Sequence, residues 1–305
     1  MGKILIFGHK NPDTDSITSS LVMEDFEKRL GKNVEATRLG NVNKETQYVL
    51  DYLKIDAPRL IESVEDGQEV ILVDHNEAKQ SVDNRENAKI LKVIDHHTMD
   101  FTVGYPLYYR AEPAGCTATV IYKMYKENNL EIEKNIAILM ISAIISDTLL
   151  FKSPTCTKED KEVVLKLNEV AGLNIEEYGL EMLKAGTDLS DYSEEELINL
   201  DAKEFTIGEG KTIVAQVNTA SIEEVMQRKE KIEVAINKTI EDKDLDLFMF
   251  VITDIINSNS QTITIGKNSA LIEKSYNVKL ENNTAFLPGV VSRKKQIIPV
   301  LTENA

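Results

Sequence analysis

The chain has little of what would place it in several common classes of protein. It has no tryptophan, only two cysteines (Cys116 and Cys156), and no apolar run near the roughly 20 residues that span a bilayer. Two cysteines provide neither a disulfide framework nor the spacing of a structural zinc site. The opening residues 1–8 are too short for a signal peptide and are predicted to form a buried strand. We therefore expect a cytoplasmic protein that has no membrane partner and works in a reducing compartment.

Positive charge is also scarce. The 35 Lys and Arg residues are outnumbered by 51 Asp and Glu residues, which gives a net charge of −16 with neutral histidine. Such a chain is not attracted to nucleic acid as a whole, and it lacks a basic stripe with interleaved aromatic residues. We expect no nucleic-acid partner. An anionic substrate would have to be attracted by local basic groups or by bound metal ions.

Short apolar segments alternate with helix-like segments through the first 185 or so residues. Strands are predicted at 3–8, 34–39, 69–73 and 89–94, and helices at 16–30, 44–53, 118–128 and 134–146. This alternation is typical of an α/β domain with a doubly wound, mainly parallel sheet.

The pattern changes after about residue 185, where residues 186–193 are polar and show no periodicity. Strands are then predicted at 202–207, 212–218, 247–253 and 261–266, with a long charged helix at 222–240. We interpret this part as a second, smaller mixed α/β domain. The predicted boundaries are 1–187 for the first domain, 193–305 for the second, and 188–192 for a hinge linker.

All four histidines lie just past a predicted strand and close to aspartate. They are His9, His75, His96 and His97. Loops that follow parallel strands converge on one edge of the sheet, where ligands bind. One His beside one Asp is more often a cap or a core-edge residue, but four together predict a metal site. Imidazole with several carboxylates suits Mn²⁺, Co²⁺, Fe²⁺ or Zn²⁺, and leaves Mg²⁺ open.

Two further observations bear on this metal site, and the first favours two metals side by side over one. Asp13 and Asp15 follow Pro12, which stiffens the loop, so that the two carboxylates can point to opposite sides of it. Asp147 ends a buried apolar helix, where an unpaired carboxylate is costly. Asp147 could instead cap the next segment, but we favour metal ligation.

A rare positive run, Arg293-Lys294-Lys295, stands near the end of this acidic chain. Such a run is usually a solvated face. Gly289 and Ser292 before it suggest a tight loop that can approach a ligand. A guanidinium fork matches a phosphoryl group in geometry, and lysine adds a point charge.

These motifs together resemble the DHH phosphoesterase superfamily, and the whole chain is similar to its manganese-dependent, or family II, inorganic pyrophosphatases. The match rests on residues 8–16, 74–76, 95–97, 201–205 and 292–296. The resemblance implies a first metal on His9 and Asp13, a second on Asp15, His96 and Asp147, and Asp74 as the bridge. It implies that pyrophosphate is held by His97, Lys203, Arg293 and Lys294. His75 has no firmly implied ligand role, and we interpret it as orienting its neighbours.

The resemblance also implies the reaction, which is hydrolysis of pyrophosphate by a metal-bridging hydroxide in a cleft between the domains. The catalytic residues would be Asp74, His97, Lys203, Arg293 and Lys294. The implied cofactor is two Mn²⁺ per subunit, with Co²⁺ or Mg²⁺ as substitutes and Mg²⁺ also arriving with the substrate. The implied assembly is a homodimer through the first domain. The first domain would be the DHH metal-binding domain and the second a DHHA2-like substrate-binding domain.

Two other functions are weighed against this one. Another DHH enzyme would cleave oligonucleotides, cyclic dinucleotides or polyphosphate, but its nuclease members carry a glycine-rich motif with histidine near the C-terminus. This chain has no histidine after His97 and no Gly-Gly pair. A non-catalytic scaffold would be expected to lose metal ligands, and here every implied ligand is present.

Overall fold

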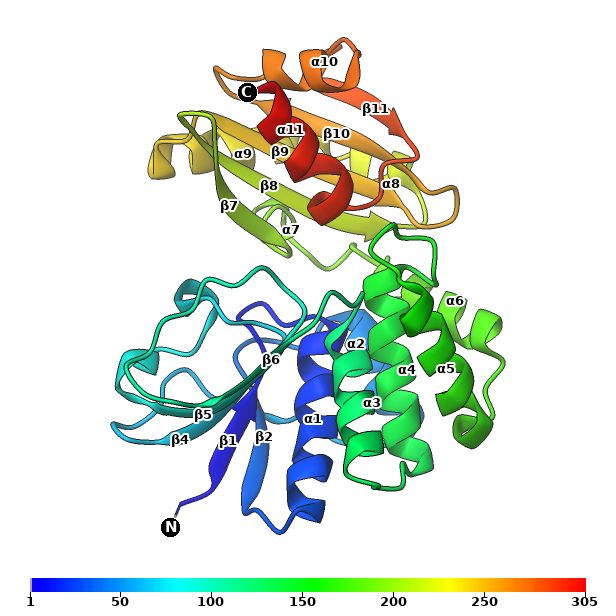
Figure 1. Cartoon of the computed structure of the whole chain (residues 1–305). Helices are drawn as coiled ribbons and strands as arrows, with labels where there is room; N and C mark the ends of the chain where they lie inside the picture. The colour runs from blue at the N-terminus through cyan, green and yellow to red at the C-terminus, as the bar shows by residue number, and fades with distance from the viewer. Residues whose placement is uncertain (1) are drawn as a thin grey trace. The chain divides into compact units, whose positions relative to one another are not determined.

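The structure is a computed structural model that describes residues 2–305. The chain divides into two compact units, Met1–Ala185 and Gly186–Ala305 (Figure 1). Each unit has its own sheet and its own buried apolar residues. The α/β class predicted from the sequence is confirmed. In the described part of the chain, every helix is too short or too polar to cross a membrane.

The first unit is built on a six-stranded sheet in which all neighbouring strands are parallel. Its strands lie in the order β3-β2-β1-β4-β5-β6. Their bounds are β1 Ile4–Phe7, β2 Val34–Arg38, β3 Arg59–Leu60, β4 Glu69–Val73, β5 Lys89–Asp95 and β6 Tyr108–Ala111. The winding reverses between β1 and β4. The loops after these two neighbouring strands therefore meet at the carboxyl edge, where open α/β sheets bind ligands.

The helices of the first unit gather on one side of this sheet (Figure 1). Their bounds are α1 Thr14–Arg29, α2 Lys44–Leu53, α3 Thr117–Glu127, α4 Lys134–Thr148, α5 Lys158–Ala171 and α6 Ile175–Gly186. The opposite face is covered by loops instead. Ile61, Val64 and Val82 pack there against Val70 and Leu72, and two 3₁₀ turns, Ala78–Gln80 and Arg85–Asn87, lie in these connections.

Helix α4 is almost wholly apolar because it lies among other helices of the first unit. It contacts α1, α3 and α5, so residues all round it are buried, as expected for a helix inside a core. It ends at Thr148, after which Leu149, Leu150 and Phe151 all have positive φ, between 47° and 66°. Each such non-glycine residue costs about 1–2 kcal/mol. Asp147 therefore sits in the last turn, just before this strained turn.

The second unit contains a five-stranded mixed sheet in the order β11-β10-β9-β8-β7. The bounds are β7 Ala202–Ile207, β8 Gly210–Thr219, β9 Leu247–Asp254, β10 Asn259–Ile265 and β11 Thr284–Pro288. Its helices are α7 Glu194–Leu197, α8 Ile222–Met226, α9 Lys229–Lys243, α10 Ala270–Tyr276 and α11 Ile298–Asn304. All eight residues of β9 are buried, because both faces of the sheet are covered. Phe248 and Phe250 pack with Ile236 of α9, whereas Met249 packs with Leu301 of α11 on the other face.

The long helix predicted at 222–240 is wrong in one respect, because it is two helices. Helix α8 ends at Met226 and α9 begins at Lys229. Between them, Arg228 has φ −96° and ψ 4°, outside the helical region. Its guanidinium donates to the carbonyl oxygens of Leu189 and Tyr192 and to Glu194. These tertiary bonds hold the break, which no proline or glycine marks in the sequence.

Candidate metal centre

The loops after the neighbouring strands β1, β4 and β5 bring histidines and aspartates to one edge of the first sheet. His9 lies two residues past β1, Asp74 directly follows β4, and His96 directly follows β5. Asp74 has a positive φ of 58°, and its N–H donates to the Ile94 carbonyl at 2.9 Å. A strained conformation that neighbouring structure holds in this way is typical of functional sites.

A first ligand group consists of His9, Asp13 and Asp74, whose ligand atoms lie within 4.8 Å of one another. His9 Nε2 is 3.5 Å from Asp13 Oδ2 and 3.3 Å from Asp74 Oδ2. Asp13 caps helix α1, because its Oδ1 accepts from the Ser16 N–H at 2.9 Å. The other His9 nitrogen, Nδ1, is 2.7 Å from the Lys10 carbonyl and donates to it. This bond fixes the tautomer and leaves the Nε2 lone pair for a metal.

A second ligand group consists of Asp15, Asp74, His96 and Asp147, again within 4.8 Å of one another. His96 Nε2 is 3.4 Å from Asp74 Oδ1 and 3.6 Å from Asp147 Oδ2. His96 Nδ1 is 3.0 Å from the Ala114 carbonyl, which fixes its tautomer as in His9. The two groups therefore share Asp74, and each faces a different oxygen of its carboxylate.

The charges of this edge are unbalanced, and a cation would balance them. Asp74 Oδ2 is buried and accepts no hydrogen bond within the described residues. Burial, and then the carboxylate of Asp74, raise the pKa of Asp15 to about 7. Burial and then Asp15 raise the pKa of Asp147 well above its usual value. Divalent cations remove both the desolvation cost and the repulsion, so the residues present fit a metal centre.

The remaining histidines make different contacts. His97 Nδ1 is 2.9 Å from Asp95 Oδ1 and 3.7 Å from Asp74 Oδ1. Burial and the adjacent His96 lower the pKa of His97. In His75, Nδ1 is 2.9 Å from the Val73 carbonyl and Nε2 is 3.0 Å from Ser81 Oγ. Both ring nitrogens of His75 are therefore engaged away from the two ligand groups.

The other predicted residues, Lys203, Arg293 and Lys294, belong to the second unit. Lys203 lies on β7, and Arg293 begins a π-helical turn, Arg293–Ile297. The Arg293 side chain is only 11% exposed. Its Nη2 is 2.7 Å from Asp201 Oδ1 and its Nη1 is 2.6 Å from the Asp201 carbonyl. The two motifs at 201–205 and 292–296 are thus joined by this ion pair.

Sequence reasoning missed three residues that hold the ligands in place. Thr117 donates its backbone N–H to Asp15 Oδ2 at 2.7 Å and its hydroxyl to Asp74 Oδ1 at 3.1 Å. Ser19 donates to Asp15 Oδ1 at 2.5 Å. Asp95 accepts from the backbone N–H groups of His96 and His97. Only Ser19, one helical turn after Asp15, could have been found from spacing.

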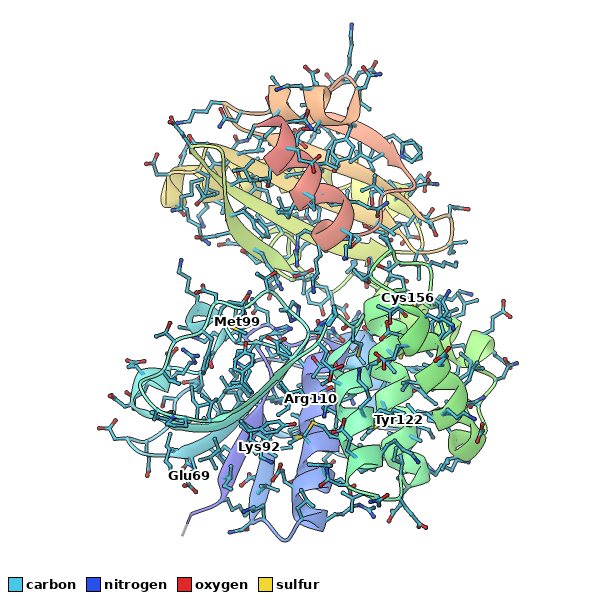
Figure 2. All side chains as sticks on the ribbon, in the orientation of Figure 1. Glu69, Lys92, Met99, Arg110, Tyr122 and Cys156 are labelled. Atoms are coloured by element: carbon cyan, nitrogen blue, oxygen red, sulfur yellow. The ribbon has the colours of Figure 1, made fainter. Side chains whose placement is uncertain are left out.

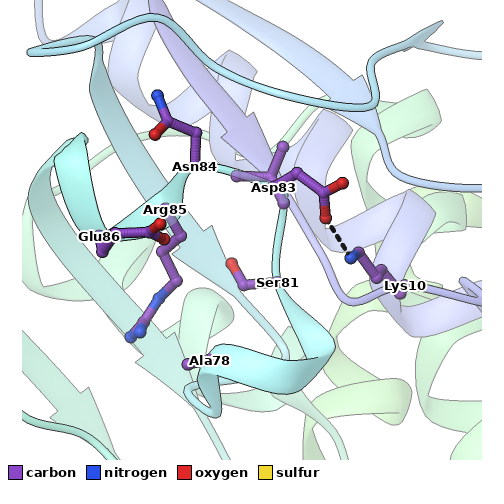
Figure 3. A pocket seen from close by; sticks show the side chains of 8 residues that line it. Lys10, Ala78, Ser81, Asp83, Asn84, Arg85 and Glu86 are labelled. Carbon is purple, nitrogen blue, oxygen red and sulfur yellow. Dashed lines mark hydrogen bonds and ion pairs between the residues drawn. The ribbon is translucent and has the colours of Figure 1, made fainter.

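A pocket of about 350 Å³ lies on the loop-covered side of the sheet, beside Lys10 (Figure 3). Its lysine is ion-paired, and its arginine donates to a backbone carbonyl. Lys10 Nζ is 2.6 Å from Asp83 Oδ1, and Arg85 Nη2 donates to the Asn76 carbonyl at 3.0 Å. The pocket also contains Glu86, so its lining is balanced in charge and does not favour an anion.

The fold and this cluster define a class: an α/β protein whose first unit carries a candidate dinuclear metal centre at the carboxyl edge of a parallel sheet. Comparisons with known proteins identify the family. Residues 3–144 match the DHH family, N-terminal domain, and residues 180–304 match the DHHA2 domain.

The most similar relatives cover the full chain. It is 58% identical over 305 residues to the manganese-dependent inorganic pyrophosphatase of Bacillus subtilis, with 99% of each chain covered. It is 57% identical over 307 residues to a probable manganese-dependent inorganic pyrophosphatase of Exiguobacterium, covering 100% of this chain and 99% of the relative. A crystal structure of a putative family II inorganic pyrophosphatase from Methanococcus jannaschii has a TM-score of 0.87 at 42% identity and covers 98% of both chains. The chain therefore belongs to the family of manganese-dependent inorganic pyrophosphatases, as its motifs predicted.

Proposed function

We propose that this protein hydrolyses inorganic pyrophosphate to two phosphates at the metal centre of its first unit, with manganese as the metal. The position of Asp74 carries the proposal. Its Oδ2 is 3.3 Å from His9 Nε2, and its Oδ1 is 3.4 Å from His96 Nε2. A carboxylate shared in this way could hold two cations, as in two-metal phosphatases. The manganese-dependent inorganic pyrophosphatase of Bacillus subtilis, which is 58% identical to this chain, supports pyrophosphate as the substrate.

The two groups support a set of metal ligands. His9 and Asp13 would hold one Mn²⁺, Asp15, His96 and Asp147 would hold the other, and Asp74 would contact both. The subunit would then bind two ions, with Co²⁺ or Mg²⁺ as substitutes and a further Mg²⁺ carried by the substrate. When bound, such ions lower the pKa of the attacking water and neutralise pyrophosphate oxygens.

His97 is proposed to bind a phosphate oxygen. Asp95 holds its Nδ1 at 2.9 Å, which fixes the ring and leaves Nε2 directed away from that carboxylate. An imidazole oriented by a buried carboxylate can share a proton with a phosphoryl oxygen without rearranging. His75, with both nitrogens engaged, would support the loop rather than touch substrate.

Lys203, Arg293 and Lys294 of the second unit are proposed to neutralise the pyrophosphate oxygens and the departing phosphate. The bonds to Asp201 orient the planar guanidinium of Arg293 in advance, so less freedom is lost when it binds a phosphoryl group. Residues 188–192 would act as the hinge that brings these side chains to the metal centre.

We further propose a cytoplasmic homodimer. Cys116 and Cys156 are both unpaired thiols, which fits a reducing compartment. Strand β6 is an edge strand of the first sheet, and Tyr108 on it is 44% exposed. An exposed edge strand is suited to pairing with a second copy, and light scattering at micromolar concentration tests the dimer.

The function is tested by phosphate release from pyrophosphate by metal-stripped protein, with Mn²⁺ or Mg²⁺ added back. A short oligonucleotide, a cyclic dinucleotide and polyphosphate serve as parallel substrates. We expect rapid, metal-restored release from pyrophosphate alone. Cleavage of a nucleotide or of polyphosphate instead would keep the metal centre but reject the substrate, and inactivity toward all four would favour a non-catalytic scaffold.

A further inference from the structure

One buried carboxylate near the metal centre belongs to neither ligand group. Glu45 lies in the first turn of helix α2 and is 8% exposed. It has no Lys or Arg partner among the ion pairs of the described residues, so no cation explains its burial. Burial raises its pKa, and hydrogen bonds from Ser146 and Thr14 oppose that rise.

The contacts of Glu45 reach both ends of the metal centre. Its Oε1 accepts from Thr14 Oγ1 at 2.6 Å and from Ser146 Oγ at 2.5 Å. Thr14 stands between Asp13 of the first ligand group and Asp15 of the second. Ser146 directly precedes Asp147 of the second group. A single carboxylate oxygen therefore links the start of helix α1 to the last turn of helix α4.

Contacts on either side of Glu45 fix the position of this link. Asn43 caps α2 by accepting from the Thr46 N–H at 2.7 Å, and Thr46 Oγ1 lies 3.1 Å from Thr14 Oγ1. Helix α2 is thereby anchored at the turn that presents Glu45. On the other side, the strained turn at 149–151 begins two residues after Asp147. The bond at Ser146 ties the end of α4 to helix α2, in addition to the hydrogen bonds that the following turn makes with α4.

We propose that Glu45 is a positioning residue that fixes the separation of the two ligand groups and thereby sets their affinity for manganese. The inference rests on the proposed function only in taking Asp13, Asp15 and Asp147 as metal ligands. Groups that orient metal ligands from outside the coordination sphere typically change metal affinity about 10–100-fold when removed.

The test is to measure Mn²⁺ binding to metal-stripped protein. Titration calorimetry and the electron paramagnetic resonance signal of free Mn²⁺ both report the apparent Kd. Glu45→Ala should raise the apparent Kd about 10–100-fold. Glu45→Gln keeps an oxygen that accepts both hydroxyl hydrogen bonds, so its Kd should stay within about threefold of the parent. Ser146→Ala removes one donor and should weaken binding by an intermediate factor.

Glu27 offers a matched control on the same helix as Thr14. It is 1% exposed, and its Oε1 is 2.5 Å from Nζ of Lys92, the β5 residue labelled in Figure 2. At 1.5 Å rise per residue it lies about 20 Å along α1 from Thr14. Glu27→Ala should lower the melting temperature of the metal-free protein and leave the Mn²⁺ affinity unchanged.

A Glu45→Ala variant that binds Mn²⁺ with parental affinity would overturn the proposal. A Glu45→Gln variant that binds as weakly as Glu45→Ala would also overturn it, because the charge of Glu45 rather than its position would then set the affinity. If Glu45→Ala does not fold, Ser146→Ala with parental affinity overturns it. Phosphate release is measured in parallel on the parent. A parent that binds Mn²⁺ but releases no phosphate rejects the proposed function and leaves the Glu45 result standing.

Discussion

The two units of this chain differ in how the charges of their predicted site residues are balanced. The first unit places Asp15, Asp74 and Asp147 at one edge of its sheet, and burial raises the pKa of Asp15 to about 7. In the second unit, the largely buried Arg293 is neutralised by Asp201 at 2.7 Å. The carboxylate cluster of the first unit therefore needs cations for balance, whereas Arg293 of the second unit is already paired. We propose that metal dependence resides in the first unit and that the second unit supplies cationic groups that are already held in place.

The largest effect is expected from Asp74, which both ligand groups share. Asp74→Asn keeps the side-chain shape but removes the charge and replaces one oxygen by an NH2 group. One ligand group therefore loses its Asp74 oxygen, and the other keeps only a neutral amide oxygen. We expect turnover to fall by about 10³-fold and Mn²⁺ binding to weaken at both sites. Calorimetry and phosphate release provide the two readouts. Two Mn²⁺ bound with parental affinity would show that the groups do not share this residue.

The second unit is tested by Arg293→Ala, which removes a group that we propose to neutralise charge on the substrate. Turnover at saturating pyrophosphate should fall about 10²-fold, with Mn²⁺ affinity unchanged. Asp201→Asn keeps Arg293 but removes its ionic partner, and it should cause a smaller loss. A reduced Mn²⁺ affinity in Arg293→Ala would contradict the division of roles between the units.

Metal removal should affect the two units unequally. At a free Mn²⁺ concentration 100 times Kd, each site should stabilise the folded state by about 2.7 kcal/mol. Hydrogen exchange with and without EDTA should therefore show Mn²⁺-dependent protection of the loops at 9–15, 74–76 and 95–97. Strands β8 and β9 should show little change. Equal protection of both units would argue against a centre confined to the first.

A smaller effect is expected at Thr117, which donates its hydroxyl to Asp74 Oδ1 at 3.1 Å. Thr117→Val preserves the shape and the backbone N–H that binds Asp15, and loses only this hydrogen bond. Because one such bond is worth about 1 kcal/mol, the Kd for Mn²⁺ should rise about fivefold. Calorimetry measures the change, with Thr119→Val as the control, because Thr119 Oγ1 donates to Asp160 rather than to a ligand group.

The clustering of the histidines and aspartates could be predicted from the sequence because it follows from the order of the parallel strands. Parallel strands direct their following loops to one edge, so His9, Asp74 and His96 had to approach one another once β1, β4 and β5 were recognised. The supporting contacts follow no such rule. Thr117 lies 102 residues from Asp15, and only the packing of α3 beside α1 brings it there.

Other features escaped prediction for local physical reasons. Strand β6 has four residues, with a burial pattern that shows no alternation between core and solvent. The break at Arg228 is made by bonds to Leu189 and Tyr192, which periodicity within 222–240 cannot reveal. The left-handed conformation of Asp74 depends on its bond to Ile94, a residue on the neighbouring strand.

We propose that Asp74 lies between two metal ions held by different residues. Anomalous diffraction at the manganese edge, from crystals grown with Mn²⁺, would locate both ions. We expect two peaks in each subunit, one contacted by His9 and Asp13, the other by Asp15, His96 and Asp147, with Asp74 touching both. A single peak, or two peaks that do not share Asp74, would contradict it.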